Sequence, residues 1–136
     1  MQIGNAIKDY ITEFNYLLHQ IYLCSKSDDN EITHDYQYNF GNNMRKFLET
    51  YLFFKYPTYK LSFHQRIREF FDDDISHNLI TRVTNEYSHL GENFDRGIKP
   101  IDLDEIRSIS QTVLNMIEKK DKDQYLALYD SIKNEK

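Results

Sequence analysis

The sequence is poor in several residue types on which whole classes of fold depend. Its 136 residues include one cysteine, two prolines and four glycines. A single cysteine excludes an internal disulfide and a cysteine-based zinc cluster, and it fits a reducing, cytoplasmic environment. The scarcity of glycine and proline argues against a β-sandwich or β-barrel, because those folds need many tight turns.

Long apolar runs are also missing. No stretch approaches the roughly 18 apolar residues that a transmembrane helix requires. The N-terminus lacks the basic segment and apolar run that are typical of a signal peptide. Hydrophobic residues make up 40% and charged residues 29%, which is the composition of a globular protein. We therefore expect a cytoplasmic protein with no membrane partner.

Apolar residues recur at three- and four-residue steps along most of the chain, which is the period of an amphipathic helix. The pattern predicts helices over about residues 2–25, 36–56 and 63–71, a fourth that starts at the acidic run 72–74, and further helices that start near Asp102 and Asp121. The apolar face of the fourth helix would comprise Ile75, Leu79, Ile80, Val83 and Tyr87. We therefore predict a single all-α domain over 1–136, a bundle of five or six helices.

Local signals support these helix ends. Tyr56 precedes Pro57, and a residue before proline disfavours helical geometry. Asp102 stands three residues before Glu105, which is a capping-box pattern. Carboxylates at 72–74 would suit the free N–H groups at a helix start. Gly91, Gly97 and Pro100 indicate a loop between two helices.

Charge is uneven along the chain. The net charge of −5 argues mildly against nucleic-acid binding. Residues 45–68 nevertheless hold six basic residues and one acid, so this segment carries +5 and the rest of the chain −10. Aromatic residues alternate with these bases, and such a combination can hold phosphates and stack bases. The predicted RNA-binding residues are Lys46, Lys55, Lys60, Arg66 and Arg68. In the alternative interpretation, the aromatics form core and the bases a solvated face.

Two polar faces are candidates for a site. Arg45 and Glu49 stand four residues apart in the second helix, so they are neighbours and can form an ion pair. In the fourth helix a polar row lies close to opposite the apolar face, and it comprises Asn78, Arg82, Asn85 and His89. Asparagine is a poor helix former, which favours a role for this row beyond local stability. The alternative is that the row hydrogen-bonds to a neighbouring loop.

Other chemistry finds little support. A zinc site from His77 with Asp73 or Asp74 lacks the ligand spacing of a known site. A phosphate-binding glycine-rich loop, a nucleophile elbow and a His-Glu-x-x-His motif are absent from the sequence. We therefore expect no metal and no cofactor. Cys24 is interpreted as a small packing residue.

Two longer motifs carry a resemblance to a known family. The stretch NNMRKFLETYLFFKYP (42–57), followed by LITRVTNEYSHLGENFD (79–95), resembles the C-terminal region of ATPase-linked anticodon nucleases of the RloC and PrrC kind. That region is similar to a HEPN domain, an α-helical ribonuclease module. The segment RVTNEYSH also matches the HEPN signature, in which four to six residues separate an arginine from a histidine. The resemblance covers roughly residues 36–130 and implies a HEPN-like helical bundle.

The resemblance implies an activity and a set of site residues. It implies a metal-independent endoribonuclease of a bacterial defence or toxin system, acting on RNA, with tRNA anticodons as one option. Products would be a 2′,3′-cyclic phosphate and a 5′-OH. The catalytic residues would be Arg45, Glu49 and His89. Supporting residues would be Asn42, Arg82, Asn85 and Ser88, with Arg82 as the rival catalytic arginine of the general HEPN pattern. A homodimer, and an ATPase as partner or parent chain, are also implied.

A second hypothesis belongs to a different class. The chain could be a non-catalytic helical interaction module, antitoxin-like or an assembly subunit, that pairs with an ATPase or a nuclease. The net acidity favours this hypothesis.

Overall fold

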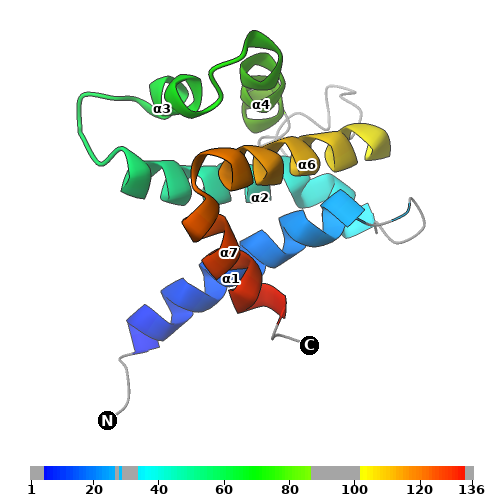
Figure 1. Cartoon of the computed structure of the whole chain (residues 1–136). Helices are drawn as coiled ribbons and strands as arrows, with labels where there is room; N and C mark the ends of the chain where they lie inside the picture. The colour runs from blue at the N-terminus through cyan, green and yellow to red at the C-terminus, as the bar shows by residue number, and fades with distance from the viewer. Residues whose placement is uncertain (1–4, 27, 29–33, 87–101, 134–136) are drawn as a thin grey trace.

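The computed structural model describes residues 5–26, 28, 34–86 and 102–133, and this part of the chain is helical without a strand (Figure 1). The helices are α1 (Asn5–Lys26), α2 (His34–Lys55), α3 (Phe63–Phe70), α4 (Asp74–Glu86), α6 (Leu103–Lys120) and α7 (Lys122–Lys133). The prediction of an all-α bundle with five or six helices is confirmed for the described residues. None of these helices combines the length and the apolar character that crossing a bilayer requires.

The helices form three layers around α2 and α6. Figure 1 shows α3 and α4 on one side of this pair and α1 with α7 on the other. The helix α2 contacts α1, α3, α4 and α6, while α6 contacts α1, α4 and α7. Most apolar stripes of the bundle are therefore buried against α2 or α6.

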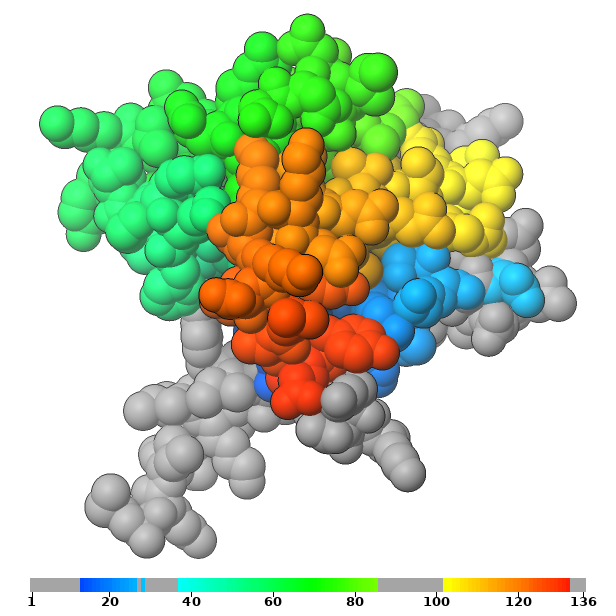
Figure 2. Space-filling view, viewed as in Figure 1, coloured from blue at the N-terminus to red at the C-terminus, as the bar shows by residue number. Residues whose placement is uncertain are grey.

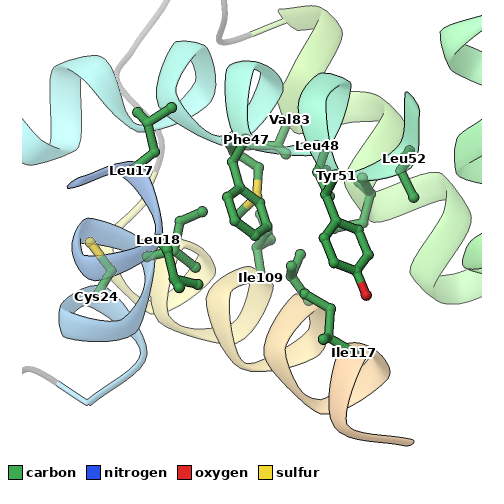
Figure 3. Close-up of a cluster of buried hydrophobic side chains, with 14 of the residues drawn as sticks. Leu17, Leu18, Cys24, Phe47, Leu48, Tyr51, Leu52, Val83, Ile109 and Ile117 are labelled. Atoms are coloured by element: carbon green, nitrogen blue, oxygen red, sulfur yellow. The ribbon is translucent and has the colours of Figure 1, made fainter. Parts of the chain in front are cut away.

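The core is centred on one stripe of α2. Its buried members are Phe40, Met44, Phe47, Leu48, Tyr51 and Leu52. The ring of Phe47 is fully buried and stacks on Phe14 of α1, with centroids 5.1 Å apart, and on Tyr51, at 5.9 Å. Figure 3 shows Phe47 between Leu18 of α1 and Ile109 of α6. The Phe14 contact joins α2 to α1, and Ile109 lies on the α6 side of the same ring.

Cys24 lies in the same cluster, as the sequence interpretation expected. Its side chain is buried, and burial raises the pKa of the thiol to about 11. The sulfur therefore stays a neutral thiol and packs as a small apolar group.

One predicted helix cap is wrong. Asp102 is the N-cap of α6, but its side chain makes no capping hydrogen bond. Glu105 instead forms an ion pair with Arg82 of α4, so its carboxylate is directed toward α4. A capping box forms at α3, where Ser62 and Gln65 exchange side-chain to backbone hydrogen bonds. The Glu105 carboxylate thus has a cation from another helix as its partner, which the local sequence pattern does not contain.

The helix α4 starts where the sequence predicted, but its predicted apolar face is only partly buried. Asp73 Oδ2 accepts a hydrogen bond from the Ser76 amide at 2.8 Å, and this bond lowers the pKa of the carboxyl. Ile80 and Val83 are fully buried, but Ile75 is 82% exposed, so its predicted core position is wrong. Ile75 belongs to the first turn, and α4 reaches α2 at its other end, near Thr84. Tyr87 and the predicted loop glycines and proline lie outside the described residues.

A polar clamp joins the C-terminal end of α2 to the junction of α6 and α7. Asp121 accepts a hydrogen bond from the Tyr51 hydroxyl at 2.5 Å and forms an ion pair with Lys55 at 2.6 Å. Partial burial works to raise the pKa of Asp121, but the Lys55 and Tyr51 contacts outweigh it and the pKa lies below 3.8. Burial and the Asp121 hydrogen bond raise the pKa of Tyr51. The ionised carboxylate therefore stabilises the folded chain.

Asp121→Asn should lower the free energy of unfolding at neutral pH by about 1–2 kcal/mol, because Lys55 and Tyr51 lose a charged acceptor. The folded pKa of Asp121 is depressed, so its contribution is present above about pH 3.8 and is lost as the pH falls through the folded value. Urea denaturation of both proteins should show a difference that shrinks with acidification. A difference that grows toward acid pH would contradict the clamp.

Candidate functional site

The predicted Arg45–Glu49 pair is present on α2. Arg45 Nε donates to Glu49 Oε1 at 2.7 Å. The Arg45 side chain is 30% exposed and that of Glu49 is 48% exposed, so the pair borders solvent. Such exposed pairs contribute only about 0.3–0.5 kcal/mol to stability. The main consequence of the pair is that it fixes the direction of the Arg45 guanidinium.

Two further contacts hold the Arg45 guanidinium. Its carbon lies 5.0 Å from the centroid of the Phe63 ring of α3. Its Nη1 donates to the Thr84 carbonyl of α4 at 3.4 Å. Arg45 therefore links three helices, and its charged group points toward the C-terminal part of α4.

The polar row of α4 divides between two roles. Asn78, Arg82 and Asn85 are exposed, as predicted. Arg82 forms the ion pair with Glu105 that joins α4 to α6, which is a structural role. Asn85 follows Thr84 and so lies next to the Arg45 contact. Ser88 and His89 lie outside the described residues, so the predicted meeting of Arg45 and His89 stays a prediction.

The predicted RNA-binding residues differ in what they contact. Arg66 donates to the Tyr56 carbonyl at 3.0 Å and to the Thr58 carbonyl at 2.8 Å, and so holds the turn after α2. Arg68 pairs with Asp74 at 3.1 Å, and Lys55 belongs to the Asp121 clamp. The remaining two, Lys46 and Lys60, are exposed, as is the supporting residue Asn42.

The aromatic residues of segment 45–68 fall into both predicted classes. Phe47 and Tyr51 are core, whereas Phe53, Phe54 and Tyr59 are 41%, 67% and 99% exposed. The Arg66 guanidinium covers the Phe53 ring at 5.3 Å. A groove of about 450 Å³ lies over this surface, and its lining comprises Glu49, Thr50, Phe53, Phe54, Phe63 and Arg66. Aromatic and charged side chains therefore meet directly beside Glu49.

A larger groove, of about 740 Å³, lies between α1, the end of α2 and the start of α7. We call it the α2–α7 groove. Its lining includes Phe14, Tyr51, Phe54, Lys55, Lys120 and Lys122. Sequence reasoning missed Lys120 and Lys122, although they form a basic cluster with Lys119 that could have drawn attention.

The described residues hold no group of three or more histidine, cysteine or acidic side chains placed to bind a metal ion. The His77 ring lies near the Asn78 side chain, at 3.4 Å, and near the Thr81 hydroxyl, at 3.5 Å. The zinc site considered from the sequence thus has no three-ligand cluster in this part of the chain.

Comparison with known proteins identifies a family. The family model AAA_13, described as an AAA domain, matches residues 1–115. The chain belongs to the AAA domain family. No curated protein and no solved structure matches it.

This family assignment corrects the resemblance drawn from the sequence. The AAA domain is an ATPase-type family, so the assignment to the HEPN-like region of anticodon nucleases is wrong, and the HEPN-like label for the bundle falls with it. The described parts of the quoted motifs lie mainly on two amphipathic helices, α2 and α4, and the residues assigned to a site are polar positions on them. Arginine, asparagine and glutamate are common on the solvent side of any such helix, so their spacing does not separate one helical family from another.

Membership of the AAA domain family does not by itself bring an ATP site to these residues. The sequence has no glycine-rich loop that ends in Gly-Lys-Ser/Thr. The described part of this AAA domain chain also has no strand to position such a loop. In the described part of the chain, the groups available for chemistry therefore lie on the surfaces of helices.

Arg82→Ala should lower the free energy of unfolding by about 1 kcal/mol, because it leaves the Glu105 carboxylate, which is 20% exposed, without its cation. Arg68→Ala is the matched control. Its partner Asp74 is 80% exposed, so the loss should stay below about 0.5 kcal/mol. Chemical denaturation measures both. Equal losses would contradict the bridging role of Arg82.

Proposed function

We propose that the chain is a metal-independent endoribonuclease in which Arg45, Glu49 and His89 act on one phosphodiester. The observation that carries the proposal is the Arg45–Glu49 pair, held at 2.7 Å and aimed toward α4. His89 follows α4 in the sequence by three residues. The proposal therefore requires that the chain after Glu86 bring the imidazole toward Arg45.

The chemistry suits these residue types. RNA carries its own nucleophile, the 2′-OH, so cleavage needs proton transfer and charge stabilisation but no metal. Imidazole titrates near neutral pH, and His89 would transfer a proton to or from the reacting oxygens. The Arg45 guanidinium would stabilise the extra negative charge on the phosphorus-centred transition state. Attack by the 2′-OH leaves a 2′,3′-cyclic phosphate and a 5′-OH.

Glu49 and Asn85 would support this pair. Glu49 fixes the Arg45 side chain through Nε, which leaves the two terminal nitrogens for the phosphate and for Thr84. Asn85 is exposed beside the Arg45 contact and offers a hydrogen bond to a phosphate oxygen or to His89. RNA, with tRNA as one candidate, is the proposed partner. A homodimer rested only on the overturned resemblance and forms no part of the proposal.

A second candidate function is a non-catalytic helical module that acts with an ATPase. The observation that favours it is the match to an ATPase-type family by a chain without a phosphate-binding loop. In this case the exposed aromatic residues of α2 would contact protein instead of RNA. An assay for RNA cleavage in EDTA separates the two candidates, since only the nuclease would cleave RNA.

His89→Ala should reduce metal-independent RNA cleavage by about 10²–10⁴-fold, because proton transfer is lost. Arg45→Ala should cause a comparable loss, and Arg45→Lys should restore it only in part, because a lysine lacks the two-pronged guanidinium. Cleavage of labelled tRNA and of synthetic RNA in EDTA measures the rates, with products separated by their terminal groups.

Arg107→Ala is the matched control for Arg45→Ala. Arg107 also pairs with a nearby carboxylate, Asp104, at 3.0 Å, but on α6. Its removal should leave the cleavage rate unchanged. Intact RNA after incubation with the wild-type chain would refute the nuclease and favour the interaction module.

A further inference from the structure

The α2–α7 groove is a built feature of the fold. Its walls come from α1, the last turns of α2 and the junction of α6 and α7. Figure 2 shows the end of α2 and the start of α7 on one face of the molecule. Its volume of about 740 Å³ lies within the ~300–1,000 Å³ of small-molecule sites.

The walls of this groove are fixed by polar contacts. The Asp121 clamp holds Tyr51 and Lys55 in place. Lys120 donates to the Phe70 carbonyl at 2.5 Å and pairs with Asp72 at 3.1 Å. The part of the lining made by Tyr51, Lys55 and Lys120 is thus ordered before a ligand enters.

Two kinds of surface face the groove. Phe54 presents a ring that is 67% exposed, and Phe14 lies on the opposite helix, α1. The lining also has three lysines and two aspartates. Lys55 pairs with Asp121 and Lys120 pairs with Asp72, so Lys122 is the lysine that can meet an anion in the groove. Lys122 is exposed at the rim, near the start of α7. An aromatic platform beside cations is the chemistry that binds a base and its phosphate.

We infer that the α2–α7 groove binds one unstacked nucleotide, with its base on Phe54 and its phosphate at Lys122. A free nucleotide and an unpaired residue of an RNA strand share this chemistry. The strand version rests on the proposed nuclease function. It is favoured by continuity, because the groove shares Thr50 and Phe54 with the smaller groove that contains Glu49. A strand positioned at Arg45 would place a neighbouring nucleotide there.

Fluorescence anisotropy with a labelled eight-nucleotide single-stranded RNA in EDTA tests the inference, and calorimetry with AMP and UMP forms the second arm. Phe54→Ala should weaken binding by about tenfold, because base–aromatic stacking is lost. Tyr59→Ala is the matched control, since Tyr59 is 99% exposed but does not line the groove. It should leave the affinity unchanged.

A charge-reversal pair tests the phosphate end. Lys122→Glu should weaken binding severalfold more than Lys119→Glu, because both residues are exposed and change the net charge equally but only Lys122 lines the groove. Binding of the mononucleotides with the same sensitivity to Phe54→Ala would assign the groove to free nucleotides. Binding of the oligonucleotide alone would assign it to a strand.

The outcomes separate this inference from the nuclease proposal. If both hold, Arg45→Ala lowers the cleavage rate by about 10²–10⁴-fold, and its remaining binding of the oligonucleotide stays sensitive to Phe54→Ala. Binding through Phe54 without cleavage refutes the nuclease and supports the groove. Suppose that RNA is cleaved and bound, but Phe54→Ala and Lys122→Glu weaken binding no more than their controls do. This result would overturn the groove inference and leave the nuclease proposal standing. If neither the oligonucleotide nor the mononucleotides bind saturably, the groove inference is also overturned.

Discussion

The packing of α2 against four other helices limits what its surface can do. With α1, α3, α4 and α6 around it, α2 exposes its last turn and, between Asn39 and Phe53, one stripe of residues at steps of three, four, three and four. The members of this stripe are Asn39, Asn42, Lys46, Glu49 and Phe53. Burial of the opposite stripe supplies the main driving force for the bundle. Any site on α2 therefore has to lie on this narrow stripe, at its borders or at the last turn of the helix.

Arg45 lies at such a border, and its position explains its contacts. A residue at the edge of a packed face keeps its stem against neighbouring helices while its charged group reaches solvent. Arg45 accordingly touches Phe63, Glu49 and Thr84 together. Arg82 lies at the equivalent border of α4, but the carboxylate of Glu105 occupies it. The two arginines look alike in the sequence and differ only in which helix end faces them.

Periodicity predicted the helices well because it reports directly on which side of each helix is buried. It also predicted the Arg45–Glu49 pair, since neighbours at four residues need no tertiary information. It failed where a distant helix decides the outcome. Glu105 pairs with Arg82 and does not form the predicted capping box. Three of the five basic residues assigned to RNA contact Asp121, Asp74 or backbone carbonyls. The family assignment from short polar motifs failed for another reason, because such motifs describe the surface of many amphipathic helices.

These internal contacts also lower the positive charge that segment 45–68 presents to solvent. The count of +5 overstates the positive potential over this face, because Lys55 and Arg68 are paired with carboxylates. The acidic remainder of the chain matters less than its −10 indicates, since charges beyond about 8 Å are screened at physiological ionic strength. Neither sum decides whether RNA binds. The exposed rings of Phe53 and Phe54, with cations beside them, offer contacts that work at short range. Affinity for a nucleotide on this surface would then come from stacking at least as much as from net charge.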